Sequence, residues 1–266
     1  MNQLPILMNT DMVVATLDGR KTVTRRTQGL EVINDEPSVW DFGGFETDPV
    51  LDNEDGGTTK LKGYYAYFIS EELELTKHIK VNCGKPGDLL YVRETYAKYS
   101  HEVDGDYHYK ADGERIGILL VQDYQEKELL SAYRPSIHMP KSVARIWLQV
   151  KKLRLERLLN ISPDQAIKEG ISSIGKNYLD LTLYRDYSKP SSKIAFGHMY
   201  PRASFKTLWE SINGQDSWIK NPWVWVMDFE VLSTKGIGEI NLEELTNSPM
   251  TNDQSPNSPI NQSPKK

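Results

Sequence analysis

Two long segments in which apolar and polar residues alternate constrain the fold of this chain more than any other feature. Residues 142–158 place four apolar side chains on one face, namely Ala144, Ile146, Leu148 and Val150. Residues 221–232 do the same with Trp223, Trp225, Met227, Phe229 and Val231. A period of two is typical of a β-strand with one buried face. Both segments are therefore predicted to be long strands, and the second is expected to be central and buried.

Short helices are predicted between the strands. Residues 9–19 begin with a capping residue, Asn9 or Thr10, and end at a glycine, and residues 204–214 carry apolar side chains at helical spacing. Residues 161–171 combine Ser162 as the cap with Pro at the first helical position and Gln165 three residues after the cap. Short helices therefore separate the strands, but without the regular repeat of β-α-β units.

The predicted fold is mostly β with packed helices (α+β), and we expect a β-barrel with helices on its surface. A further strand is predicted at 87–97, where strand-forming residues follow a Pro-Gly pair. Residues 41–60 are rich in Gly and Asp and are interpreted as a long surface loop. Residues 246–266 are rich in Ser, Pro, Asn and Gln and are expected to be a disordered tail, because they can bury little apolar surface.

The composition excludes several classes of protein. The 266 residues carry a net charge of -5, so bulk electrostatics does not favour binding of long DNA or RNA. Cys83 is the single cysteine, which leaves no intramolecular disulfide. The N-terminus does not resemble a signal peptide, and no apolar run is long enough to span a membrane. We therefore expect a cytoplasmic protein with no membrane partner.

Familiar catalytic and metal-binding motifs are absent from the sequence. There is no phosphate-binding G-x-x-x-x-G-K-[ST] loop, no G-x-G-x-x-G after a strand and no G-x-S-x-G elbow. The five histidines show no H-E-x-x-H spacing, and there is no C-x-x-C. Cys83 and His138 are interpreted as structural residues. We expect no metal and no cofactor.

The stretch DGRKTVTRR, residues 18–26, needs an explanation in an acidic chain. It packs four cations, Arg20, Lys21, Arg25 and Arg26, among two threonines. One interpretation is a solvated basic strand, which is the usual fate of a charge run. The other is a site in which the Lys21 amine turns inward after the glycine. Neighbouring cations disfavour the charged form of such a lysine, which is one route to an activated amine.

The motif Gly19-x-Lys21-x-x-Thr24-x-Arg26 resembles the signature of ASCH domains, which belong to the PUA-like superfamily of small β-barrels. The order of the capped helix, basic motif, strands and final helix–strand pair agrees, and the overall likeness is closest to phage- and prophage-encoded members. The resemblance implies an ASCH domain over residues 1–233 with insertions near 31–80 and 98–135. Residues 234–266 would be a linker and disordered tail, and the setting a bacterial cell or phage-infected host.

Members of this family differ in what they do, and two functions follow from the resemblance. Some are proposed to bind RNA. A small bacterial branch with the motif G-R-K-T-x-T, matched here by residues 19–24, hydrolyses the acetyl amide of N4-acetylcytidine. By that likeness Thr24 would be the nucleophile, Lys21 its activator and Glu169 the family glutamate, while Arg26 would contact the ligand. This chain has Arg25 where that branch has an apolar residue, which leaves the pocket walls undefined.

Glu169 also has physical support as a site residue. It lies in the last turn of its predicted helix, where the negative end of the helix dipole disfavours a charged carboxylate. An exposed glutamate at a frayed helix end is the competing interpretation. In a regular strand Lys21 and Thr24 would point to opposite faces, so the three residues can meet only if a turn or bulge separates the lysine from the threonine.

The expected partner is RNA or a modified nucleoside. Predicted ligand-binding residues are Arg20, Arg25, Arg26 and Tyr96, with Trp147 and Trp223 as further candidates for stacking on a base. Two functions stay open: an amidohydrolase that acts on an acylated nucleoside through Lys21, Thr24 and Glu169, and a non-catalytic RNA- or modified-base-binding module.

Overall fold

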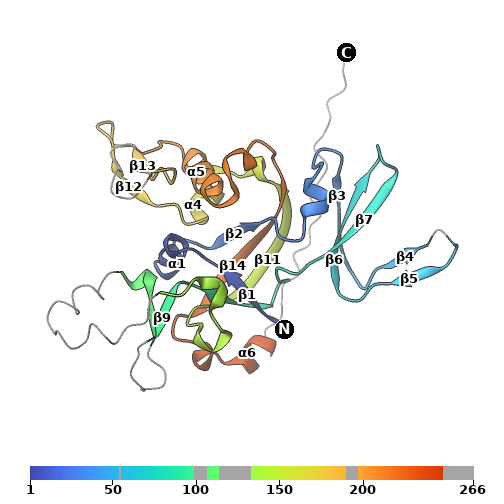
Figure 1. The fold of residues 1–266 in the computed structure, drawn as a ribbon, viewed down its shortest axis with the longest axis horizontal. Coiled ribbons are helices and arrows are strands. Elements are labelled where there is room, and N and C mark those ends of the chain that lie inside the picture. Colours follow the sequence, from blue (N-terminus) through green and yellow to red (C-terminus); the bar gives the residue numbers. More distant parts are fainter. Residues whose placement is uncertain (54, 99–106, 114–132, 190–196, 248–266) are drawn as a thin grey trace, which may run out of the picture.

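A five-stranded mixed sheet organises the fold. The computed structural model describes residues 1–53, 55–98, 107–113, 133–189 and 197–247 (Figure 1). The strand order is β1-β8-β11-β14-β2. The strands are β1 (Gln3–Leu7), β8 (Leu89–Arg93), β11 (Trp147–Arg157), β14 (Trp223–Ser233) and β2 (Val23–Arg26). The two strands predicted from their alternating pattern, β11 and β14, lie side by side near the middle, and β14 is central as expected.

The pairing of these strands is antiparallel except between β1 and β8, which run parallel. The β11–β14 ladder extends from the pair of Trp147 with Ser233 to the pair of Arg157 with Trp223. Register shifts interrupt it after Trp147 and after Val150. Because a bulge adds a residue to one strand, it bends and twists that strand. Figure 1 shows β11 curving along the sheet.

The helices confirm the capping signals of the sequence. They are α1 (Thr10–Leu17), α2 (Glu31–Asn34), α4 (Pro163–Lys168), α5 (Pro201–Asn213) and α6 (Leu242–Asn247). The Asn9 side chain accepts from the backbone N–H of Met12 at the start of α1. Ser162 and Gln165 form a reciprocal capping box at the start of α4. Helix α5 begins three residues before the predicted segment, since Pro201 occupies its first turn.

Shorter elements complete the described part of the chain. Two hairpins pair β9 (Tyr96–Lys98) with β10 (Tyr107–Tyr109) and β12 (Ser173–Lys176) with β13 (Thr182–Tyr184). Turns of 3-10 helix are Lys110–Asp112, Ser136–His138, Lys141–Val143, Leu158–Asn160, Gln215–Ser217 and Ile237–Glu239.

The interpretation of residues 41–60 as a long loop is wrong. They form β3 (Asp41–Thr47), β4 (Val50–Asp52) and β5 (Thr58–Lys60), and β3 joins β6 (Tyr64–Ser70) and β7 (Leu75–Lys80) in a second sheet. Two of the glycines that suggested a loop, Gly43 and Gly44, make room for a neighbouring side chain. A Cβ on Gly43 would lie 2.0 Å from the Tyr67 ring, which packs across this part of β3.

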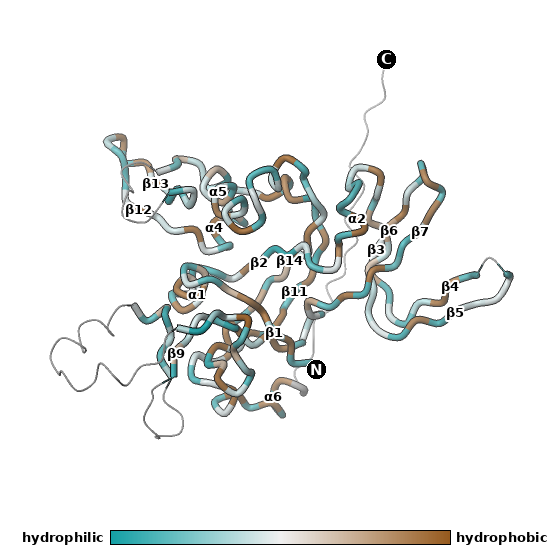
Figure 2. The backbone as a smooth tube through the Cα atoms, in the orientation of Figure 1, coloured by the Kyte–Doolittle hydropathy of each residue, from teal (hydrophilic) through white to brown (hydrophobic). Residues whose placement is uncertain are grey.

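Two apolar clusters hold these layers together. The larger lies between the five-stranded sheet and the helices α1, α4 and α5, and includes Val13, Leu208 and Val226. The second joins the two sheets, where Phe68 of β6 meets Trp223 of β14 edge to face. Figure 2 shows hydrophobic colour along the central strands and a more polar β4–β5 hairpin.

The α+β class is confirmed, but the described residues form no closed barrel. The strands β1 and β2 are the two edges of the five-stranded sheet, and no strand ladder joins them. The expected insertion at 98–135 falls largely outside the described residues, as does nearly all of the expected tail. Residues 234–247, expected to be linker, include a 3-10 turn and α6. None of the helices in the described ranges is both long and apolar enough to cross a membrane.

Candidate functional site

Lys21 lies in a turn between α1 and β2. The chain reverses after α1 at Gly19, whose φ of +72° is in the region that favours glycine. The backbone N–H of Lys21 then donates to the carbonyl of Ala15. Lys21 forms an isolated bridge with Glu169, and β2 begins two residues later at Val23. This turn precedes Lys21, and the β2–β14 ladder from Val23 to Arg26 has no register shift, so the turn or bulge that the sequence required between Lys21 and Thr24 is not found there.

The Lys21 ammonium is buried and fully hydrogen-bonded. Its side chain is 2 % exposed. The Nζ donates to Glu169 Oε2 at 2.8 Å, to the Glu169 carbonyl at 2.9 Å and to the Val23 carbonyl at 2.8 Å. An ammonium has three protons, and each one has an acceptor here. Lys21 and Glu169 thus form a direct buried ion pair, and Glu169 is not an exposed residue at a frayed helix end.

Arg25 completes this cluster, although the sequence suggested it as a ligand contact. Its Nη1 donates to Glu169 Oε1 at 3.0 Å, so the two carboxylate oxygens of Glu169 each face a different cation. Its Nη2 donates to Gln165 Oε1 at 3.0 Å and to Glu156 Oε2 at 3.3 Å. The Arg25 side chain is as buried as that of Lys21. It holds the glutamate in place rather than presenting a charge to solvent.

Burial dominates the acid–base behaviour of Lys21. Desolvation lowers the pKa of the Lys21 amine from its ordinary value, and the nearby cations Arg26 and Arg25 act in the same direction. Glu169 opposes this through charge attraction and its hydrogen bond, but the net direction is downward. The environment therefore favours the neutral amine more than water does.

Thr24 is the second residue of β2 and lies opposite Met227 of β14. In a strand, side chains alternate between faces, so Thr24 and Arg26 share one face and Val23 and Arg25 the other. The Thr24 side chain is fully buried, and its hydroxyl has no hydrogen-bond partner in the described part of the chain. The structure thus joins Lys21 to Glu169, while Thr24 is hydrogen-bonded to neither.

Side chains cover alternate carbonyls along β2. Lys21 Nζ reaches the Val23 carbonyl, and Arg26 Nη1 lies 3.4 Å from the carbonyl of Arg25. Arg26 Nη2 donates to the carbonyl of Leu7 in β1 at 2.8 Å. Because β2 pairs with β14 on one side only, the Val23 and Arg25 carbonyls have no neighbouring strand to bond. Cationic side chains of the basic motif provide the hydrogen bonds to these two carbonyls instead.

The other predicted ligand-binding residues lie apart from this cluster. Arg20 donates to the carbonyl of Gly170 at 2.8 Å and pairs with Asp18 near the surface. Tyr96 is buried in a separate apolar cluster, and its hydroxyl lies 3.3 Å from the His138 carbonyl. Trp147 and Trp223 are buried core residues. None of these three aromatic rings offers an open face on which a base could stack.

Sequence reasoning did not identify Gln165 and Glu156 as members of the cluster. Gln165 was visible only as a helix-capping residue, although its side-chain oxygen also accepts from Arg25. Glu156 had no signal beyond its place in an alternating strand.

Burial raises the pKa of the Cys83 thiol to about 12, which keeps it protonated at neutral pH. Within the described ranges, no group of three or more His, Cys, Asp or Glu side chains could hold a metal ion.

The chain has no match among protein-family models, curated proteins or solved structures.

Proposed function

We propose that this protein is an ASCH-domain protein of the PUA-like superfamily that hydrolyses an acyl amide on a modified nucleoside, through Lys21, Thr24 and Glu169. The observation that carries the proposal is the Thr24 hydroxyl. It is completely buried, has no partner among the described residues, and lies in the strand that follows a buried Lys21–Glu169 pair. The resemblance of the basic motif to this family supplies the class of substrate.

A buried hydroxyl without a partner is costly. Leaving such a group unsatisfied costs about 1–3 kcal/mol relative to a bonded one. Most buried polar side chains in proteins find a partner, so an exception calls for a specific explanation. Thr16, another buried threonine, follows the usual rule and donates to the carbonyl of Met12 at 2.9 Å. A ligand that brings a carbonyl group to Thr24 would satisfy its hydroxyl.

The proposed reaction has two halves. The Thr24 oxygen attacks the carbonyl carbon of the acyl amide, and its proton passes to the neutral Lys21 amine. The tetrahedral intermediate collapses when the carbon–nitrogen bond breaks, and Lys21 returns the proton to the departing nitrogen of the base. Water then attacks the Thr24 ester, which releases the carboxylic acid and restores the hydroxyl. No redox partner is needed.

Glu169 and Arg25 would control the state of Lys21. The amine has all three protons engaged in the ion pair, so it must lose one before it can accept a proton from Thr24. Burial favours that loss, and the carboxylate of Glu169 keeps the amine in position. Arg25 holds the second oxygen of the same carboxylate. Glu169 is therefore assigned the role of orienting Lys21 rather than of nucleophile.

Access to Thr24 requires a local opening, because the hydroxyl is sealed in the described structure. We place the entrance between the edge strands β1 and β2. The Arg26–Leu7 hydrogen bond spans that gap, and a side-chain contact can break without loss of a strand ladder. Arg26 would then be free to contact the entering nucleoside, as the family resemblance implies.

The test is a turnover assay with matched threonine variants. Purified protein is incubated with a panel of acylated nucleosides that includes N4-acetylcytidine, and products are followed by mass spectrometry. Wild type should release the free base amine, Thr24→Val should release none, and Thr16→Val should retain activity in proportion to its folded fraction. Turnover by Thr24→Val, or none by wild type on any substrate, would reject the hydrolase. Binding without turnover would favour the non-catalytic module.

A further inference from the structure

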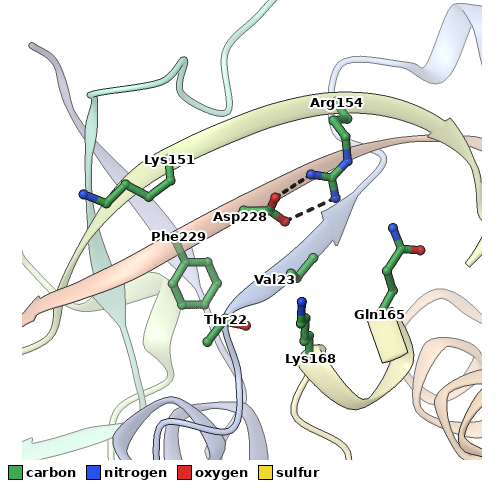
Figure 3. A pocket seen from close by; sticks show the side chains of 8 residues that line it. All are labelled: Thr22, Val23, Lys151, Arg154, Gln165, Lys168, Asp228 and Phe229. Carbon is green, nitrogen blue, oxygen red and sulfur yellow. Dashed lines mark hydrogen bonds and ion pairs between the residues drawn. The ribbon is translucent and has the colours of Figure 1, made fainter. Parts of the chain in front are cut away.

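A polar pocket lies beside β2, outside the Lys21–Glu169 ion pair. It has a volume of about 430 Å³ and is bounded by the central strands and helix α4 (Figure 3). Its lining residues are Thr22, Val23, Lys151, Arg154, Gln165, Lys168, Asp228 and Phe229. Val23 pairs with Asp228 across the β2–β14 ladder, and both alternate with Thr24 and Met227. Thr24 alternates with Val23 along β2 and is not one of the residues that line the pocket.

Three hydrogen-bond donors of this pocket are unused in the described part of the chain. They are the Lys168 amine, the Thr22 hydroxyl and the side-chain nitrogen of Gln165, for which no hydrogen bond is found. Lys168 and Thr22 are exposed. Gln165 uses only its oxygen, which accepts from Arg25 and from the backbone of Ser162. In Figure 3 the Lys168 amine and the Gln165 amide point toward the space below the Arg154–Asp228 pair.

The charges of the pocket leave one cation without a counter-ion. Arg154 binds Asp228 through both terminal nitrogens and Glu156 through Nε. Glu156 also pairs with Arg25, so each of these charges has an opposite charge beside it. Lys151 pairs with Glu230 at 2.7 Å, and its amine points away from the other lining residues. Lys168 has no ion pair within the described ranges. The pocket therefore presents a single uncompensated positive charge surrounded by neutral donors.

We propose that this pocket binds the phosphate group of a small phosphorylated molecule, such as a nucleoside monophosphate. A phosphate has several terminal oxygens and can accept from Lys168, Thr22 and Gln165 together, whereas a carboxylate has two. Lysine is a common phosphate ligand that acts as a point charge. The volume is in the range of small-molecule sites, so it leaves room beyond the phosphate itself. The proposal is independent of the hydrolase activity assigned to Thr24.

Calorimetric titration of the full chain tests this site. The probes are inorganic phosphate, cytidine 5′-monophosphate and cytidine. We expect the monophosphate to bind and the uncharged nucleoside to bind at least about ten-fold more weakly, since a hydrogen bond to a charged group is lost. Lys168→Gln should weaken the monophosphate about ten-fold, and Thr22→Val should weaken it by a smaller factor. Both residues are exposed, so the variants should keep the wild-type melting temperature.

The control is Lys60→Gln, which makes the same charge change on the remote β4–β5 hairpin. It should leave binding unchanged. Thr24→Val should also bind the monophosphate as wild type does, which separates this proposal from the proposed hydrolysis. A short single-stranded RNA distinguishes the source of the phosphate: RNA binding that Lys168→Gln weakens, without monophosphate binding, assigns the site to a polynucleotide backbone. The proposal fails if no phosphate probe binds, or if Lys168→Gln and Lys60→Gln behave alike.

Discussion

Arg26 of β2 donates a hydrogen bond from Nη2 to the carbonyl oxygen of Leu7 in β1, at 2.8 Å. These residues end the two edge strands of the five-stranded sheet. A closed barrel would join such edges by a ladder of backbone hydrogen bonds. Here a guanidinium spans the gap, so the sheet stays open while its edges remain linked. The described strands therefore form an open sheet and not the closed PUA-like barrel that the sequence suggested.

Removal of the Arg26 side chain should loosen this link. We expect Arg26→Gln to destabilise the protein by about 1.5 kcal/mol, the lower end of the range for a hydrogen bond from a charged group. Amide hydrogen exchange should rise along β1 and β2 more than along β14. The control is Arg202→Gln, because Arg202 also donates to a carbonyl, that of Leu159, at 2.8 Å. Equal exchange in both variants would show that Arg26 does not hold the edges together.

The buried ion pair of Lys21 and Glu169 should be far more sensitive to mutation than a surface pair of the same length. Glu169→Gln leaves Lys21 without a counter-ion in the interior and takes one of two carboxylates from Arg25, and we expect a loss of about 3–5 kcal/mol. Lys176 and Asp180 also lie 2.8 Å apart, but both are largely exposed. Asp180→Asn should cost less than about 1 kcal/mol.

Urea unfolding of wild type and the two variants measures the difference. Similar losses of unfolding free energy for Glu169→Gln and Asp180→Asn would contradict a strong interaction between Lys21 and Glu169. If Glu169→Gln fails to fold, Lys21→Met with Glu169→Leu provides the second measurement, since removal of both charges should be better tolerated than removal of one.

Local signals in the sequence were sufficient where neighbouring residues determine the structure. The caps at Asn9 and Ser162 and the alternation of β11 and β14 depend on positions a few residues apart, and the structure has these elements. The segment 41–60 was misread because Gly43 and Gly44 are required by the packing of a distant residue, Tyr67, and not by a local turn. Strand formation there depends on pairing with β6, which composition does not reveal.

At the candidate site, too, contacts between distant residues could not be predicted from local sequence. The contact between Lys21 and Glu169 joins residues 148 positions apart and was expected through the family motif, not through spacing. Arg25 was predicted to face a ligand, yet it faces Glu169. A run of adjacent cations does not say which ones turn inward, because that depends on where the partner carboxylates lie in the fold. Tyr96 was predicted to stack on a base, but its ring is buried in a core cluster. The sequence around Tyr96 does not show this, because the other buried residues of that cluster lie more than 40 positions away.

The stability of the protein should depend on pH through Lys21. Its folded-state pKa is lower than the ordinary value of 10.5, so between those two pKa values the unfolded chain binds more protons than the folded one. Stability then rises with pH across this window and is fully gained above 10.5. Lys21→Met lacks the group and should show a shallower rise. Urea unfolding of both proteins between about pH 7 and about pH 10 measures the difference. Parallel curves would contradict the lowered pKa.

The Thr24 hydroxyl leads to the sharpest stability test, because its removal should help the fold. Thr24→Val keeps the shape of the side chain and deletes a buried oxygen that has no partner in the described structure. Since an unsatisfied buried group costs about 1–3 kcal/mol, we expect the free energy of unfolding to stay the same or to rise by about 1 kcal/mol.

Thr16→Val is the matched control for that substitution, because Thr16 is equally buried but its hydroxyl donates to the Met12 carbonyl. Its hydroxyl is satisfied, so its removal should bring no such gain, and we expect a loss of up to about 1 kcal/mol. Urea unfolding at neutral pH compares both variants with wild type. A stabilising Thr24→Val that also abolishes amide hydrolysis would show that the hydroxyl is kept for chemistry at the expense of stability. If Thr24→Val lowers the free energy of unfolding by more than about 1 kcal/mol, the hydroxyl has a partner in the folded protein. That result would remove the observation on which the role of Thr24 as nucleophile is proposed.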